Sequence, residues 1–97
     1  MSKFSSVDFE VHGKVQGVFF RKFAQKRAQE LGLSGFVQNT PKGTVIGHVE
    51  GDRTKVQQMK QWLEKVGSPK SRIDKTVFAD EKPVSQLAGT GFIIKQT

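Results

Sequence analysis

Two segments of the chain each carry a single apolar stripe at the spacing of an α-helix, with polar residues on the remaining sides. The first helix is expected to begin at Phe20 and end before Gly32, and the second to begin after Asp52, whose side chain can cap it. Because a helix with one stripe needs one apolar surface to cover, both helices are expected on the same face of one sheet. The stripes consist of Phe20, Phe23, Ala24, Ala28 and Leu31 in the first helix, and of Val56, Met59, Trp62, Leu63 and Val66 in the second.

Short β-strands are predicted around the two helices. Residues 7–12 alternate between apolar and polar side chains, as expected of a half-buried strand. The turn-forming residues 40–43 separate two further strands, which are expected to pair as a hairpin. The polar stretch 80–91, with one proline and two glycines, is predicted to be a loop. The predicted strands are residues 7–12, 35–39, 44–50, 73–79 and 92–94.

The predicted order is strand, helix, strand, strand, helix, strand, followed by a short terminal strand. This order is that of a split βαβ arrangement, an α+β ferredoxin-like βαββαβ sandwich. We therefore expect an antiparallel sheet with two helices on one face and an extra short C-terminal strand. A chain of 97 residues suits one domain, so residues 1–97 are expected to form it. The fold by itself does not fix the activity.

The composition limits the chemistry and the surroundings of the chain. It has no cysteine, which excludes disulfides, thiolate zinc sites and cysteine nucleophiles, and which fits a reducing compartment. No apolar run reaches the ~20 residues of a membrane span, and residues 1–6 lack the apolar core of a signal peptide. We therefore expect a soluble cytoplasmic protein, and nothing in the sequence indicates more than a monomer. The net charge of +7 favours an anionic partner, either a small phosphorylated molecule or a nucleic acid.

The junction between the first strand and the first helix, residues 12–21, is the candidate binding site. Gly13 and Gly17 allow the backbone to turn its N–H groups inward, which forms a concave site for anions. The positive end of the helix dipole adds to this attraction. Arg21 lies in the first turn of the helix, where its planar guanidinium can bind two oxygens of one phosphoryl group. These features predict a phosphate cradle at residues 13–21.

Several known phosphate-site patterns are absent from the sequence. The spacing of Gly13 and Gly17 does not match the GxxxxGK[ST] pattern of ATP-binding loops, and no GxGxxG dinucleotide pattern occurs. The loop holds neither cysteine nor serine, so a covalent phosphoenzyme is not expected there. His12 and His48 lie on the polar sides of their predicted strands, so they are expected at the surface and receive no catalytic role.

The residues alone leave other functions open. Arg21 can be a solvated arginine, and Asn39, next to Thr40 and Pro41, can be a turn-forming asparagine. An RNA-binding module has the same strand order and suits the positive charge, but such modules stack bases on aromatic side chains of the third strand. Residues 44–50 contain no Phe, Tyr or Trp, which weighs against base stacking. A non-catalytic protein that binds phosphorylated metabolites with the same loop is a further alternative.

Three stretches of the sequence resemble the acylphosphatase family. Residues 13–21, GKVQGVFFR, closely resemble the family signature Gly-x-Val-Gln-Gly-Val-x-Phe-Arg. Residues 35–39 form a second match at the family's usual spacing, and residues 67–74 are similar to the vertebrate-type members. The resemblance extends from about Val7 to the final strand. It implies the same ferredoxin-like fold that the periodicity predicts.

The resemblance also implies an activity, the hydrolysis of the carboxyl–phosphate bond of acyl phosphates without a cofactor or a metal ion. In the family, the loop backbone and the arginine bind the phosphate, and an asparagine orients the attacking water. The expected partners are small acyl phosphates and inorganic phosphate, whereas a nucleic acid and a membrane are not expected. The implied site residues are Arg21 and Asn39 as catalytic residues, with the backbone of Lys14, Val15, Gln16, Gly17, Val18 and Phe19 binding phosphate.

Overall fold

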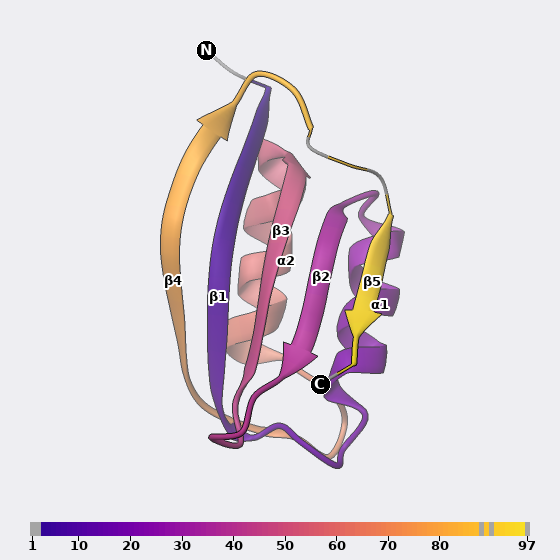
Figure 1. Ribbon diagram of the computed structural model, residues 1–97, viewed down its shortest axis with the longest axis vertical. Coiled ribbons are helices and arrows are strands. Elements are labelled where there is room, and N and C mark those ends of the chain that lie inside the picture. Colours follow the sequence, from indigo (N-terminus) through magenta and orange to yellow (C-terminus); the bar gives the residue numbers. More distant parts are fainter. Residues whose placement is uncertain (1–2, 88, 90, 97) are drawn as a thin grey trace.

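The computed structural model describes residues 3–87, 89 and 91–96 of the chain. Within these ranges, five strands and two helices follow one another in the predicted order (Figure 1). Neither of the described helices is long and apolar enough to cross a membrane. The elements are β1 (Phe4–Lys14), α1 (Phe20–Glu30), β2 (Ser34–Asn39), β3 (Val45–Asp52), α2 (Arg53–Lys65), β4 (Arg72–Val84) and β5 (Phe92–Lys95).

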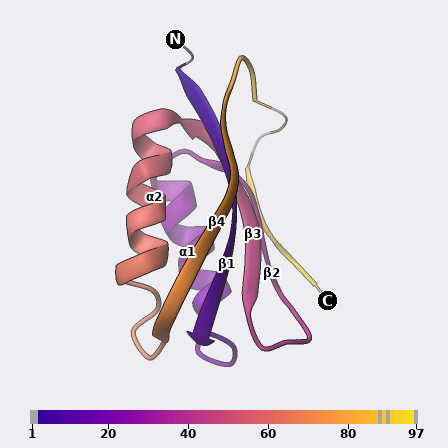
Figure 2. The same cartoon turned by 90° about the vertical axis from the view of Figure 1, so that its left-hand side faces the viewer.

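The strands form one mixed sheet in the order β4-β1-β3-β2-β5. β1 pairs antiparallel with β3 and β4, β2 pairs antiparallel with β3, and β5 runs parallel to β2. α1 connects β1 to β2, and β3 lies between these two strands in the sheet. α2 connects β3 to β4, and β1 lies between that second pair. Both helices cover the same face of the sheet (Figure 2). These features confirm the ferredoxin-like α+β fold, the β2–β3 hairpin and the short C-terminal strand.

The hydrophobic core lies between the sheet and the two helices. Val7 and Val11 of β1 are fully buried, which confirms that one side of the alternating strand faces the core. Phe9 lies between them and packs over Gly47 of β3, where a β-carbon would clash with the Phe9 ring. A glycine in the middle of β3 therefore makes room for the aromatic side chain on the neighbouring strand.

The two helices contact each other through Phe20 and Trp62, whose ring centroids lie 5.4 Å apart. Phe20 is fully buried, and Trp62 packs partly buried against the core. Because Phe20 is the first residue of α1, this contact fixes the start of the helix relative to the core. The position of Arg21, the next residue, is fixed with it.

β4 is longer than predicted, because residues 80–84, expected in a loop, continue the strand. This extension pairs with the start of β1, where Phe4 lies opposite Val84 and Ser5 lies opposite Pro83. The extension lies at the sheet edge and is mostly exposed, so it carries no apolar alternation. A proline is tolerated there because an edge strand has a backbone side that needs no partner.

Two side chains predicted for the apolar stripes are exposed to solvent instead of buried. Val66 is 62% exposed, since it follows Lys65, the last residue of α2, and lies at the C-cap of that helix. Phe23 is 37% exposed although it lies within α1.

Candidate active site

A cavity of about 390 Å³ lies at the start of α1. Its walls include Arg21, from the first turn of α1, and Asn39, the last residue of β2. The rest of α1 and most of β2 separate these two residues in sequence, and both line the cavity because the helix returns the chain to the sheet. The lining residues are Val15, Gly17, Phe19, Phe20, Arg21, Lys22, Asn39, Ile94 and Gln96.

The loop between β1 and α1, residues 15–19, offers its backbone to the cavity. Gly17 and Phe19 have positive φ angles of 74° and 60°, whereas Val18 between them does not. When left-handed and right-handed backbone conformations alternate, successive N–H groups point toward one side, which is the geometry of an anion-binding nest. Among the described residues, the N–H groups of residues 16–22 have no hydrogen-bond acceptor. They are therefore available to an anion.

The N-terminus of α1 has no side-chain cap. Phe19 occupies the N-cap position, and the first turn of this helix contains no acidic residue. The start of α2 differs, because Asp52 accepts a hydrogen bond of 3.0 Å from the N–H of Thr54, which confirms the predicted cap. The bare start of α1 leaves the positive end of its dipole open toward the cavity, where it favours negative charge.

The side chains of Arg21 and Asn39 both lack partners within the part of the chain that the structure describes. Arg21 is half-buried and makes no hydrogen bond or ion pair there. The side-chain oxygen Oδ1 of Asn39 is buried and accepts no hydrogen bond from these residues. A buried polar atom without a partner costs about 1–3 kcal/mol of stability. Because Asn39 also lines the cavity, its side chain is a candidate for a hydrogen-bonding role there.

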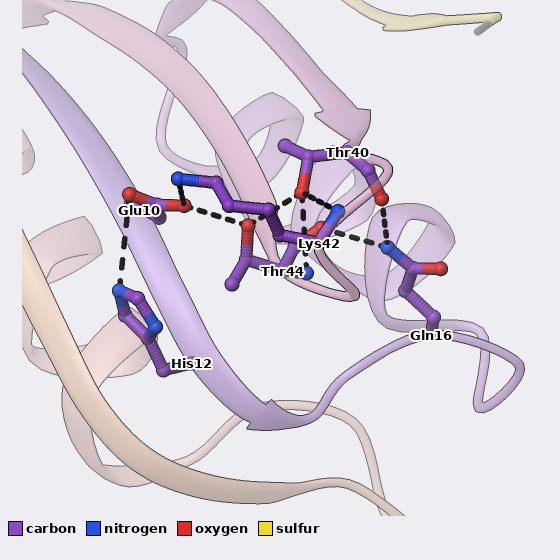
Figure 3. Close-up of polar contacts among 6 residues, drawn as sticks. All are labelled: Glu10, His12, Gln16, Thr40, Lys42 and Thr44. Atoms are coloured by element: carbon purple, nitrogen blue, oxygen red, sulfur yellow. Dashed lines mark hydrogen bonds and ion pairs between the residues drawn. The ribbon is translucent and has the colours of Figure 1, made fainter.

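The side chain of Gln16 connects the loop to the turn that follows Asn39 (Figure 3). Its Nε2 donates to the carbonyl oxygens of Thr40 and Thr44, each at 2.9 Å. The backbone of the turn is closed by a 2.9 Å hydrogen bond from the N–H of Thr40 to the carbonyl oxygen of Thr44. The sequence predicted only a backbone role for Gln16. No pattern could reveal this contact, because its acceptors are backbone carbonyls that only the fold brings near.

A line of hydroxyl contacts continues from this turn to β1 (Figure 3). The Oγ1 of Thr44 donates to Oε2 of Glu10 at 2.7 Å and lies 2.7 Å from the Oγ1 of Thr40. Since the single proton of Thr44 goes to the carboxylate, the Thr40 hydroxyl is the donor between the two threonines. The hydrogen bond from Thr44 lowers the pKa of Glu10, and the nearby charges of Lys42 and His12 lower it further.

The side chains of the predicted loop residues are placed in different ways. Those of Val15 and Phe19, together with Gly17, line the cavity, whereas Lys14, Gln16 and Val18 do not. Val18 is buried in the core, and Lys14 is the last residue of β1, where it lies opposite Arg72 of β4. The sequence assigned these residues a backbone role, which stays a prediction.

The fold and the cavity define a class of protein, a ferredoxin-like sandwich with an open backbone loop and an arginine at the start of its first helix. Residues 7–94 match the acylphosphatase family. The chain is 53% identical over 90 residues to acylphosphatase-2 of Homo sapiens, a match that covers 93% of this chain and 91% of that protein. It is 55% identical over 87 residues to acylphosphatase-2 of Gallus gallus, covering 90% of this chain and 84% of that protein.

Solved structures give the same result. The acylphosphatase from Bacillus subtilis superposes with a TM-score of 0.84 at 33% identity, covering 94% of this chain and 98% of that one. An acylphosphatase from Coxiella burnetii superposes with a TM-score of 0.83 at 31% identity, covering 96% of this chain and 94% of that one. The chain belongs to the acylphosphatase family.

Proposed function

We propose that this chain hydrolyses acyl phosphates to a carboxylate and inorganic phosphate in the cavity beside Arg21 and Asn39. Membership of the acylphosphatase family supports the reaction. One observation supports the location: a single cavity is lined by an uncapped helix start, an arginine without a partner among the described residues and the residue that bears a buried amide oxygen. Each of the three suits one part of the reacting group.

The phosphoryl group binds to the loop in this proposal. Its oxygens accept hydrogen bonds from backbone N–H groups of residues 14–19, and the guanidinium of Arg21 binds them from the side. Each hydrogen bond to a charged group contributes roughly 1.5–3 kcal/mol. Backbone N–H groups and a helix start are fixed by the fold, so they stabilise the charge of the transition state without rearranging.

Asn39 positions the water molecule that attacks phosphorus. Its amide oxygen accepts a hydrogen bond from the water, which turns a lone pair of the water oxygen toward the phosphoryl group. The new bond joins the water oxygen to phosphorus, while the bond from phosphorus to the carboxyl oxygen breaks. The electron pair of the broken bond leaves with the carboxylate, and the proton of the water passes to a phosphoryl oxygen. Asn39 needs no basicity for this role.

The leaving group explains why so few groups are sufficient. A carboxylate has a conjugate acid with a pKa of ~4, so it departs without being protonated. An alkoxide leaving group is about as basic as hydroxide, whose conjugate acid, water, has a pKa of ~15.7. Such a leaving group would need a general acid to protonate it. We therefore propose a reaction without a metal ion. Within the described ranges, no three His, Asp or Glu side chains gather in a way that could hold a metal.

RNA binding is the weaker alternative on structural grounds as well. Phe36 lies on β2, opposite His48 of β3, and the ammonium of Lys95 lies 4.0 Å from the centroid of its ring. A base would have to displace this cation before stacking on Phe36. β3, the strand on which RNA-binding modules place their aromatic side chains, has no Phe, Tyr or Trp.

Turnover of acetyl phosphate in the presence of a metal chelator tests the function. We expect release of inorganic phosphate at a rate that the chelator does not change, with added inorganic phosphate acting as a competitive inhibitor. Loss of activity on chelation would contradict the metal-free reaction. Tight, salt-dependent RNA binding without any hydrolysis would favour the alternative.

We further propose that residues 1–97 act as one acylphosphatase domain, as a monomer in the cytoplasm. One hydrophobic core between the sheet and both helices supports a single domain. The absence of cysteine fits a reducing compartment. Sedimentation at micromolar concentration tests the oligomeric state, and a mass of twice the chain mass of 10.8 kDa would contradict a monomer.

A further inference from the structure

Phe19 has an unusual position for a large apolar side chain. It is 72% exposed, and its φ angle of 60° places it in the left-handed region. Bulky side chains are disfavoured in that region, where Gly, Asn and Asp are common. The ring buries little surface, so core packing does not account for it. Strained backbone positions that the surrounding structure retains cluster at functional sites.

Three hollows of the surface meet at Phe19. It lines the cavity of about 390 Å³ with Arg21 and Asn39. It also lines a hollow of about 550 Å³ along α1, which shares Phe19 and Lys22 with the cavity. A third hollow, of about 300 Å³, shares Phe19 and Gly17 with the cavity. The ring of Phe19 therefore lies where the cavity opens to the outside.

Phe23 extends this apolar surface along α1. It follows Phe19 by one helical turn, and its N–H donates a hydrogen bond of 3.1 Å to the carbonyl oxygen of Phe19. Both rings line the hollow along α1 and the third hollow. The exposure of Phe23, which the predicted apolar stripe did not explain, thus places a second aromatic ring next to the first. Lys22 and Lys26 also line the hollow along α1, to which their long alkyl chains can add apolar surface.

We propose that Phe19 and Phe23 form the surface on which the acyl group of the substrate rests, and that the enzyme favours acyl phosphates with an apolar acyl group. This inference rests on the proposed function. If the loop and Arg21 hold three phosphoryl oxygens inside the cavity, the fourth oxygen carries the acyl group out through the mouth. An acyl group that leaves there contacts Phe19, and the hollow along α1 extends the contact to Phe23.

The proposal predicts how the two kinetic constants respond. The contact between the rings and the acyl group lies away from the reacting atoms, so it is equally strong in the bound substrate and in the transition state. Such uniform binding lowers KM without raising kcat. An apolar acyl group should therefore lower KM, and loss of the rings should raise KM for that substrate.

The test compares benzoyl phosphate with acetyl phosphate. The readout is the ratio of kcat/KM for the two substrates, in the native chain and in variants of the full chain. A displacement of the loop backbone that affects both substrates equally cancels in this ratio. The difference in their intrinsic reactivity cancels when the ratio of a variant is compared with that of the native chain. Phe19→Asn removes the ring and keeps a residue that tolerates the left-handed region. Phe19→Leu restores apolar surface, and Phe23→Ala removes the second ring.

We expect the ratio to fall about 3- to 10-fold in Phe19→Asn, because an open apolar wall buries only part of the benzoyl ring. A smaller fall is expected in Phe23→Ala, and Phe19→Leu should recover much of the preference. Val77→Ala is the matched control, since Val77 is 45% exposed and lines a hollow formed by the strands, remote from the cavity. It should leave the ratio unchanged.

Two outcomes overturn the inference and are distinguishable. An unchanged ratio in both Phe19→Asn and Phe23→Ala, with both substrates still hydrolysed, would refute the acyl surface and leave the proposed function intact. If Phe19→Asn loses all activity, Phe23→Ala decides by the same ratio. A native chain that hydrolyses neither substrate would refute the proposed function, and the inference with it.

Discussion

Arg21 and Asn39 lie in one cavity but differ in how the fold holds them. Arg21 is half-exposed at a helix start and, within the described residues, free to reach an anion. The oxygen of Asn39 is buried, at the end of a strand whose pairing with Val45 of β3 fixes its backbone. A guanidinium without a partner among the described residues suits binding of an anion, and an amide on a backbone fixed by strand pairing suits the orientation of a single water molecule.

Arg21→Gln should abolish hydrolysis and inhibition by inorganic phosphate together, because one guanidinium serves both. The fold should remain, since the side chain makes no hydrogen bond or ion pair to the described residues. Circular dichroism and thermal unfolding check the fold. Arg27→Gln makes the same change of charge in the same helix, where Arg27 pairs with Glu30 at 3.4 Å, and should keep the activity. Normal turnover by Arg21→Gln would show that the arginine has been assigned wrongly.

Asn39→Ala should lower kcat by about 10²–10³, the usual effect of losing one preorganised catalytic group, with little change in KM. KM should hold because the phosphoryl group is bound by the loop and Arg21. Steady-state kinetics with acetyl phosphate measures both constants. Gln38→Ala removes the neighbouring amide, which does not line the cavity, and should have little effect. Unchanged kcat in Asn39→Ala would remove this residue from the mechanism.

At the scale of elements, the loop before α1 and the turn after β2 are joined through Gln16. Gln16→Met keeps the length of the side chain and removes both donors. The carbonyl oxygen of Thr44 still accepts from the N–H of Thr40, and that of Thr40 still accepts from the N–H of Gly43. No acceptor is left without a partner, so the unfolding free energy should fall by only about 1–3 kcal/mol, the net value of two hydrogen bonds.

The same variant should lower kcat more than its effect on stability suggests, because the loop and Asn39 lose their fixed relation. Urea denaturation and turnover, measured side by side, check both effects. A variant that loses stability but keeps full kcat would show that the contact supports the fold alone.

β1 and β3 are joined by a histidine that the sequence assigned only to the polar surface. His48 is half-buried, with Nδ1 at 2.6 Å from Asp8 and Nε2 at 2.9 Å from Glu50. Burial alone would lower the pKa of His48, but the two carboxylates outweigh it and raise this pKa above the ordinary value of 6.5. The protonated imidazole donates to both carboxylates. The hydrogen bond to Asp8 joins β3 to β1, whereas Glu50 lies two residues along β3 from His48.

Because the pKa of His48 is raised in the folded state, its contribution to stability is complete below about pH 6.5 and is lost as the pH rises through the folded pKa. Thermal unfolding across pH 5.5–8.5 measures this loss. His48→Gln should flatten the decline in this range. An equally steep decline in His48→Gln would contradict the role of this contact.

For the whole molecule, the sequence predicted the order of elements, the single helix-bearing face and the two candidate side chains. Periodicity was sufficient for the fold because each helix has one stripe and β1 alternates. Periodicity failed for residues 80–84, since an exposed edge strand has no buried side to mark it. It also missed the ion pairs of His48, because alternation shows which side of a strand is polar and not which side chains meet across strands.

The candidate site was predictable only in part. Glycines before an arginine at a helix start indicate an anion site by local physics, so the loop and Arg21 could be selected. Asn39 needed the family resemblance, because an asparagine before a turn is common. The contacts of Gln16 and the exposed ring of Phe19 depend on the tertiary arrangement, which no local pattern encodes.

A crystal structure of the chain soaked in inorganic phosphate tests the central claim most directly. We predict one phosphate ion in the cavity, on the backbone N–H groups of the loop before α1, with the Arg21 guanidinium bound to its oxygens. A water molecule within hydrogen-bond distance of both Asn39 Oδ1 and the phosphate should lie beside it. A cavity without phosphate at saturating concentration, with the guanidinium turned to solvent, would contradict the account.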